Sequence, residues 1–270
     1  MVLENLLKAA KSSGLNKKKL IGKMQDLYAE WLESGCISDM LRLYKATEIK
    51  PQFSERLLQT KYADFVEGER WYDFAGLRKL IEVEPSEEVI KKVQDKYREF
   101  LRENILSDLQ YVSELIGIKP ELPESIVCVK YHDYIKERDF EAVAMLNELV
   151  GSPDGEFVQE WFRKYLEEED LTNFKNLKDA LPEISPSEEI VQEAYNVYFR
   201  GDCRWDLFFG LYKITNIRAK LPDKIVQGKY VHCIDCGRLD DFVHLMEVTG
   251  VKPVKEVYQI FLEKVLNHEQ

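Results

Sequence analysis

The sequence lacks any hydrophobic run of about 18 residues, the length that a membrane-spanning helix needs. Its first 19 residues do not show the basic and then apolar order of a secretory signal peptide. The five cysteines are odd in number and irregularly spaced, unlike the disulfide framework of a small secreted protein. These absences predict a protein of the reducing cytoplasm that makes no membrane contact.

Catalytic signatures are also scarce. The chain has four histidines, no glycine-rich loop suited to a phosphate, and no Ser/His/Asp order typical of a hydrolase. No pair of carboxylates stands out from the background of 49 acids, and the acidic run at residues 167–170 is interpreted as a solvated turn at a helix end. We therefore predict a protein that is not an enzyme, has no cofactor and takes no small-molecule substrate.

Charge is distributed unevenly. The formal net charge is −11, but residues 1–24 carry six lysines against one glutamate, so the remainder carries −16. Residues 154–193 hold twelve acids and four bases. An acidic surface repels the phosphate backbone of nucleic acids and suits a basic partner, although solubility alone also explains it.

One pattern recurs along the chain at intervals of 31 to 35 residues. It is centred on a glutamine, once replaced by cysteine, at Gln25, Gln59, Gln94, Cys128, Gln159, Gln192, Gln227 and Gln259. Three residues later the sequence has Tyr28, Tyr62, Tyr97, Tyr131, Phe162, Tyr195 and Tyr230, then Leu262. Apolar residues also stand one position before the glutamine and six and seven positions after it, so all of these lie on one face of a helix.

A second amphipathic segment follows each of these helices. Most second segments begin with an aspartate, which suits the positive end of a helix: Asp39, Asp73, Asp108, Asp206 and Asp241. Most units close with a proline, which stops a helix: Pro51, Pro85, Pro120, Pro153, Pro186 and Pro253. Ser86 and Ser187 are predicted N-caps, and left-handed C-caps are predicted at Gly35, Asn104, Gly201 and Gly237.

Two finer expectations follow from the repeated pattern. The sixth unit lacks its closing proline and has Gly210 inside the apolar stripe, so its second helix is predicted to be distorted. The repeated glutamine borders the predicted core. We therefore expect its amide to bond a backbone group of the adjacent unit, although a surface role facing a ligand is the alternative.

Helical pairs of about 34 residues predict an all-α fold, a right-handed superhelical α-solenoid that forms a single domain over residues 1–270. Residues 1–16 are expected to form an N-terminal cap, residues 17–253 seven helical hairpins, and residues 254–270 a C-terminal capping helix.

The unit ending in Gly117, Ile118, Lys119 and Pro120, repeated at residues 250–253, resembles the pentatricopeptide repeat. It fits the tetratricopeptide repeat less consistently. The resemblance implies helical hairpins and, in the family's usual activity, one RNA base read per repeat. The positions that would read bases, one residue after the glutamine, hold Asp26, Thr60, Asp95, Val129, Glu160, Glu193 and Gly228. Only Thr60 is of the expected type, so the resemblance supports the fold more than the RNA activity.

Residues one, four and eight positions after the glutamine border the core and are expected to face the groove of such an array. The candidate binding residues are Asp26, Asp95, Arg98, His132, Lys136, Glu160, Arg163, Glu193, Asn196 and Arg200. Their mixed charge favours a scaffold for a protein or peptide partner. Single-stranded RNA binding is the alternative, favoured by Lys17, Lys18 and Lys19; a helical subunit that supports an enzyme is a third reading.

One constellation could hold a metal. Cys233 and Cys236 have the spacing of zinc-binding thiolates, and His232 and His244 could complete a tetrahedral site. Against this, Cys233 occupies a position that is aromatic and buried in the other units, so a small core residue is the simpler interpretation.

Overall fold

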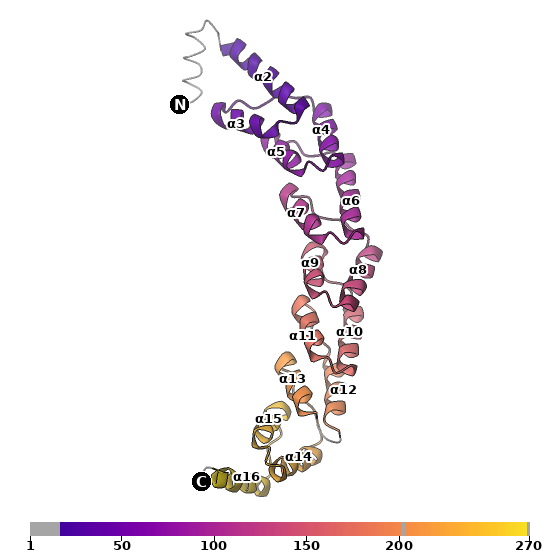
Figure 1. The fold of residues 1–270 in the computed structure, drawn as a ribbon, viewed down its shortest axis with the longest axis vertical. Helices are drawn as coiled ribbons and strands as arrows, with labels where there is room; N and C mark the ends of the chain where they lie inside the picture. The colour runs from indigo at the N-terminus through magenta and orange to yellow at the C-terminus, as the bar shows by residue number, and fades with distance from the viewer. Residues whose placement is uncertain (1–16, 201–203, 269–270) are drawn as a thin grey trace. The chain divides into compact units, whose positions relative to one another are not determined.

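The computed structural model describes residues 17–200 and 204–268, which form fifteen α-helices and no strand (Figure 1). The predicted all-helical class is confirmed. The expected N-terminal cap at residues 1–16 and the C-cap at Gly201 lie outside the described residues. No helix in the described part of the chain has the length and apolar character that a membrane span requires.

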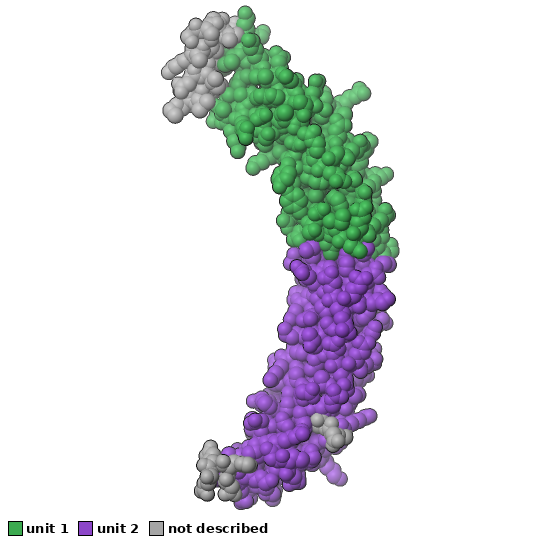
Figure 2. All heavy atoms as spheres, viewed as in Figure 1, with its two compact units in different colours: residues 1–126 green, residues 127–270 purple. Residues whose placement is uncertain are grey.

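The chain divides into two compact units, residues 1–126 and residues 127–270 (Figure 2). The first contains α2 (Lys17–Ser34), α3 (Ile37–Thr47), α4 (Glu55–Glu67), α5 (Trp71–Ile81), α6 (Glu87–Arg102) and α7 (Leu106–Ile116). The division falls within α8 (Glu124–Glu137). The second continues with α9 (Phe140–Val150), α10 (Gly155–Glu167), α11 (Leu171–Ala180), α12 (Glu188–Tyr198), α13 (Trp205–Thr215), α14 (Asp223–Asp235), α15 (Leu239–Thr249) and α16 (Lys255–His268).

Even-numbered and odd-numbered helices form two layers within each unit (Figure 1). In the first unit α4 packs on α6, and α5 packs on both α3 and α7. In the second unit α10 packs on α12, α11 packs on α9 and α13, and α13 packs on α15. Successive helices such as α4 and α5, or α10 and α11, join the layers, and the core lies between them.

The aromatic residue three positions after the repeated glutamine anchors this core. Its side chain is fully buried at Tyr28, Tyr62, Tyr97, Tyr131, Phe162, Tyr195 and Tyr230. Each even helix from α2 to α14 thus presents one ring to the odd layer, as in the contact of 4.8 Å between the ring centres of Tyr62 and Phe74. Burying one such ring stabilises the fold by about 2 kcal/mol.

The expected caps are present where the structure describes them. The hydroxyls of Ser86 and Ser187 accept hydrogen bonds from the amides of the third residue beyond them, which confirms both N-caps. The five aspartates lie in the first turns of odd helices: Asp39, Asp73, Asp108, Asp206 and Asp241. The turns between even and odd helices take a left-handed conformation at Gly35, Asn104 and Gly237 as expected, and also at Glu69, Arg138 and Glu169.

The repeated glutamine holds the linker between an odd helix and the next even helix. Gln94 donates from Nε2 to the Lys119 carbonyl (2.9 Å) and accepts at Oε1 from the Glu121 amide (2.7 Å). Tyr97 donates its hydroxyl to the Ile118 carbonyl of the same linker (2.8 Å). We call these contacts the linker clamp. The predicted bond to backbone of the adjacent unit is confirmed at Glu121, whereas Lys119 belongs to the closing segment of the same unit as Gln94.

The clamp recurs in both units. Both amide bonds are made by Gln25, Gln59, Gln94, Gln159, Gln192 and Gln227. The tyrosine bond to a linker carbonyl is made by Tyr28, Tyr62, Tyr97, Tyr131, Tyr195 and Tyr230. Linker backbone has no helical partner, so these side chains provide one. The tyrosine bonds are partly buried, whereas most of the glutamine bonds are exposed.

The predicted distortion of α13 is wrong. This helix is a regular eleven-residue helix like its neighbours. Gly210 is accommodated by close packing, since a Cβ there would lie 2.7 Å from Leu171 Cδ1. The missing proline is also compensated, because the amide at that place, Ala219 N–H, donates to the Val248 carbonyl (2.9 Å).

The last helix, α16, covers α14 but is not itself covered within the described residues. Its Phe261 ring stacks on Phe242 at 4.0 Å. Four other apolar side chains remain exposed: Tyr258, Ile260, Leu262 and Leu266. The helix expected over residues 254–270 is therefore present, with one apolar face buried and another open.

Candidate functional site

The candidate binding residues from the sequence are surface residues of even helices. Nine are exposed, and Arg98 is half-buried with its Nε enclosed and without a hydrogen-bond partner. Asp95 and Arg98 form an ion pair on α6. His132 lies edge-on to the Trp161 ring at 5.7 Å. Five more candidates form no hydrogen bond or ion pair with another candidate residue in the described part of the chain: Asp26, Lys136, Glu160, Asn196 and Arg200.

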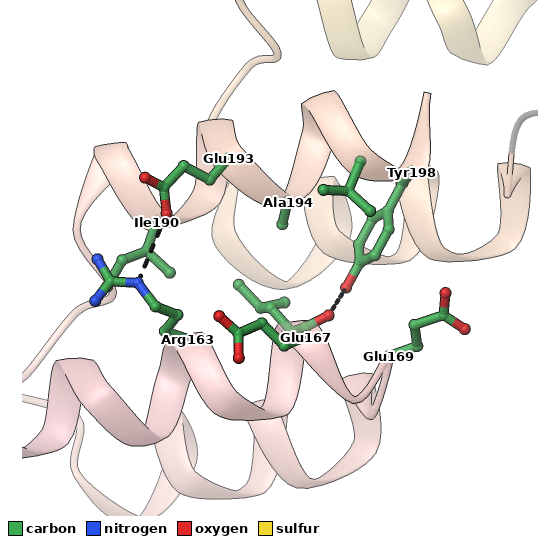
Figure 3. A pocket seen from close by; sticks show the side chains of 9 residues that line it. Arg163, Glu167, Glu169, Ile190, Glu193, Ala194 and Tyr198 are labelled. Atoms are coloured by element: carbon green, nitrogen blue, oxygen red, sulfur yellow. Dashed lines mark hydrogen bonds and ion pairs between the residues drawn. The ribbon is translucent and has the colours of Figure 1, made fainter. Parts of the chain in front are cut away.

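Two candidates meet at a pocket between α10 and α12, both in the second unit. Arg163 Nε lies 3.6 Å from Glu193 Oε2, so an ion pair bridges the two helices at one side of the pocket (Figure 3). The pocket has a volume of about 320 Å³. It is lined by Arg163, Leu166, Glu167, Glu169, Ile190, Glu193, Ala194, Val197 and Tyr198.

The floor of this pocket is apolar and fixed by the core. Leu166, Ile190, Ala194 and Tyr198 are all buried. The Tyr198 hydroxyl donates to the Leu166 carbonyl at 2.7 Å, which ties α12 to the end of α10 (Figure 3). Burial raises the pKa of Tyr198, so the hydroxyl stays protonated and able to donate at neutral pH. A rigid floor of this kind is suited to an apolar group.

The rim of the pocket is acidic. It contains three carboxylates, Glu167, Glu169 and Glu193, and one cation, Arg163. Glu193 is paired with Arg163, and Glu169 is paired with Arg204 at 2.7 Å. Glu167 has no ion pair among the residues that the structure describes. The site therefore combines an apolar floor with one uncommitted carboxylate.

The acidic run at residues 167–170 has more specific roles than the solvated turn expected from sequence. Asp170 caps α11, because its carboxylate accepts a hydrogen bond from the Asn173 amide (3.0 Å). That bond lowers the pKa of Asp170. Glu167 and Glu169 line the pocket. The three glutamates of the run are exposed as expected, but Asp170 is half-buried, and Glu167 and Glu169 belong to the candidate site.

Most residues of this site carry no functional signal in the sequence. Glu167 stands eight residues after Gln159, a spacing that defined the candidates, yet it was interpreted as part of the turn. Ile190, Ala194 and Tyr198 follow the core spacing and carry no individual signal. A register comparison between units could have found them, because it shows which units lack a basic residue opposite an acid.

The residues at the RNA-reading positions are exposed, and most of them are not of the type that the resemblance implies. The hydroxyl of Thr60, the one residue of the expected type, bonds the Arg56 carbonyl of its own helix (3.0 Å). Glu193 is engaged with Arg163. Lys17, Lys18 and Lys19 are exposed at the start of α2.

The proposed metal constellation is not assembled. Cys233 is a fully buried core residue, whereas Cys236 is exposed with its Sγ 3.7 Å from His232 Nε2. The His244 ring packs against Phe209 at 5.0 Å. No cluster of three or more His, Cys, Asp or Glu side chains suited to a metal occurs in the described parts of the chain.

Thiol reactivity should separate the two cysteines. Burial raises the pKa of Cys233 to about 12, so its thiolate fraction at pH 8 is on the order of 10⁻⁴. We expect N-ethylmaleimide to modify Cys236 in the folded protein and to leave Cys233 unmodified, as measured by mass spectrometry of peptides. Modification of Cys233 in urea serves as the control. Equal rates for both residues without urea would contradict the buried position of Cys233.

In comparisons with known proteins, no family model, curated protein or solved structure matches the chain. The resemblance to pentatricopeptide repeats therefore stays a prediction.

Proposed function

We propose that the chain is a non-catalytic cytoplasmic scaffold, an α-solenoid of seven helical hairpins in one superhelical domain, whose even helices hold a protein or peptide partner. The partner is basic where it meets α10 and α12. The recurrence of the linker clamp supports the repeat architecture, since the same three contacts close successive linkers.

The pocket between α10 and α12 carries this proposal. Protein interfaces place apolar anchors in pockets and surround them with a polar rim. Here Val197, which is 61% exposed, extends the buried floor formed by Ile190 and Ala194 to the surface. The rim carries three acids against one base, so a phosphate backbone is repelled and a basic segment is attracted.

Photo-crosslinking tests the proposal. A benzophenone amino acid at position 197, in place of valine, is expected to form an adduct with a defined protein in extracts of the source cells. The adduct should resist ribonuclease and disappear with protease. Mass spectrometry of the adduct identifies the partner and the segment that contacts the pocket.

The matched control is the same substitution at Val243, which is exposed by 41% on the odd helix α15 of the same unit. We expect no adduct there. An adduct at position 197 that ribonuclease removes would assign the surface to RNA. Equal adducts at both positions, or none at 197, would remove the support for a binding face on the even helices.

A further inference from the structure

The first unit contains two ion pairs that join consecutive even helices. Lys92 Nζ of α6 lies 2.6 Å from Glu67 Oε1 at the end of α4. Lys96 Nζ, one turn further along α6, lies 3.0 Å from Glu69 Oε1. The hydrogen bond to Lys92 lowers the pKa of Glu67, so this acid is committed to its lysine.

The second unit keeps both acids and loses both lysines. Glu67 and Glu69 stand eight and ten residues after Gln59, and Glu167 and Glu169 stand at the same distances after Gln159. Glu69 and Glu169 share a left-handed backbone conformation, with φ of 54° and 59°. The two turns therefore place their two acids at the same register and share a left-handed residue at the second acid.

The lysines stand two residues before and two residues after Gln94. The corresponding residues around Gln192 are Ile190 and Ala194. Both are buried in the floor of the pocket. Where the first unit has two lysines, the second unit therefore has two shorter apolar side chains. The pocket lies beside these side chains and the two acids (Figure 3).

The equivalent surface of the first unit supplies the contrast. At the place of Glu167 and Ile190 the first unit has the ion pair of Glu67 and Lys92, and these two residues border a hollow of about 350 Å³ that otherwise extends over different positions of α4 and α6. Its acid is already satisfied from within the chain. Glu167, in contrast, has no ion pair within the described ranges 17–200 and 204–268.

From this comparison we infer that the pocket between α10 and α12 binds a lysine or arginine side chain of the partner, with its charged end at Glu167. Lysine and arginine join an apolar stem to a charged end. The stem lies on Ile190, Ala194 and Val197, and the charge takes the place that Lys92 Nζ occupies beside Glu67. This inference rests on the proposed scaffold function and specifies the chemistry recognised at the same site.

Two short peptides that differ in one residue provide the probe. One has lysine at its centre, flanked by valine and glutamine, and the other has norleucine, which keeps the stem and removes the charge. Titration is followed by methyl NMR at Ile190 and Val197 in the full chain. We expect the lysine peptide to shift both methyl signals and the norleucine peptide to bind at least about tenfold more weakly, the size of one charge-assisted hydrogen bond.

Matched variants separate this site from the general acidity of the chain. Glu167→Gln is expected to weaken lysine-peptide binding about tenfold. Glu67→Gln removes the same charge from the equivalent place in the first unit and should leave binding unchanged. Both residues are exposed, so both variants are expected to fold. Equal weakening by both, or equal binding of the two peptides, would overturn the inference.

A variant that places the two lysines of α6 at the equivalent positions of α12 tests the comparison of the two units directly. Ile190→Lys with Ala194→Lys restores the arrangement of α6 and should abolish peptide binding, with the helical circular dichroism unchanged. If the pair does not fold, Ala194→Lys alone is expected to reduce binding. Persistent binding to a folded variant would count against the inference.

The outcomes of the crosslinking and peptide experiments can be told apart. A protein crosslink at position 197, together with equal binding of the lysine and norleucine peptides, would leave the scaffold proposal standing and reject only this inference. Lysine-selective binding without such a crosslink would reject the scaffold proposal instead.

Discussion

Raising the pH above about 10 is expected to unfold the chain cooperatively, because its buried tyrosine hydroxyls cannot ionise in place. Six of them donate to linker carbonyls, and those of Tyr165 and Tyr198 donate to the ends of the preceding even helices. Burial raises the pKa of all eight, to about 12 for Tyr165 and Tyr230. A tyrosinate has no proton to donate, so ionisation breaks the contact.

The direction in which pH changes the free energy of unfolding follows from the tyrosine pKa values in the folded and unfolded chains. Each tyrosine releases its proton near pH 10 in the unfolded chain and at higher pH in the folded chain. Its contribution to the free energy of unfolding is therefore complete below pH 10 and declines as the pH rises towards the folded pKa. The decline is at most about 1.4 kcal/mol per pH unit for each tyrosine. Eight such groups together make this the largest effect that we expect.

The measurement follows tyrosinate absorbance and helical circular dichroism in one alkaline titration. Buried tyrosines are expected to ionise in the same transition that removes the helices. Tyr97→Phe provides the control, because Phe162 already occupies the equivalent place in another unit. This variant should lose about 1 kcal/mol at neutral pH and show a shallower alkaline transition. Ionisation of every tyrosine near pH 10 with the helices intact would contradict the linker clamp.

Replacing Gln94 with leucine is expected to lower the free energy of unfolding by about 2 kcal/mol. Gln94 is only 5% exposed, and its amide satisfies the Lys119 carbonyl and the Glu121 amide together. Leucine can fill a similar volume but leaves both backbone groups without that partner. Urea unfolding followed by circular dichroism measures the loss.

Gln259→Leu is the matched control for this variant. Gln259 occupies the same register position on α16, is exposed, and makes no hydrogen bond within the described residues. Its replacement should leave the urea midpoint unchanged. Amide exchange adds a local readout, because the Glu121 amide should exchange faster only in Gln94→Leu. An unchanged or higher midpoint for Gln94→Leu would reject a stabilising role for the clamp.

The helices and their buried faces could be predicted from the sequence because burial repeats with the helical period. This period predicts the burial of Tyr97 and its equivalents and places the glutamine beside the core, whereas the N-caps at Ser86 and Ser187 are predicted by the acids that follow them. Contacts between residues that lie far apart in the sequence do not follow from this period. Examples are the close packing of Leu171 beside Gly210 of α13, and the hydrogen bond from the Ala219 amide to the Val248 carbonyl.

The candidate site was predictable only in part, for a different physical reason. Spacing rules identified Arg163 and Glu193 because both are exposed on even helices. They do not show that an acid lacks its partner, since Glu67 and Glu167 have the same spacing. That difference appears only when the facing residues, Lys92 and Ile190, are known to lie opposite these acids.

The linker clamps join residues that are close together in the sequence. Their hydrogen bonds join residues 20 to 28 positions apart. A side-chain hydrogen bond from Arg78 to the Ile116 carbonyl spans 38 positions. Only short loops have to close, so the entropy of loop closure is small and the contact order low, which favours rapid folding. Each pair of helices can therefore pack on the pair before it while the rest of the chain is still being synthesised.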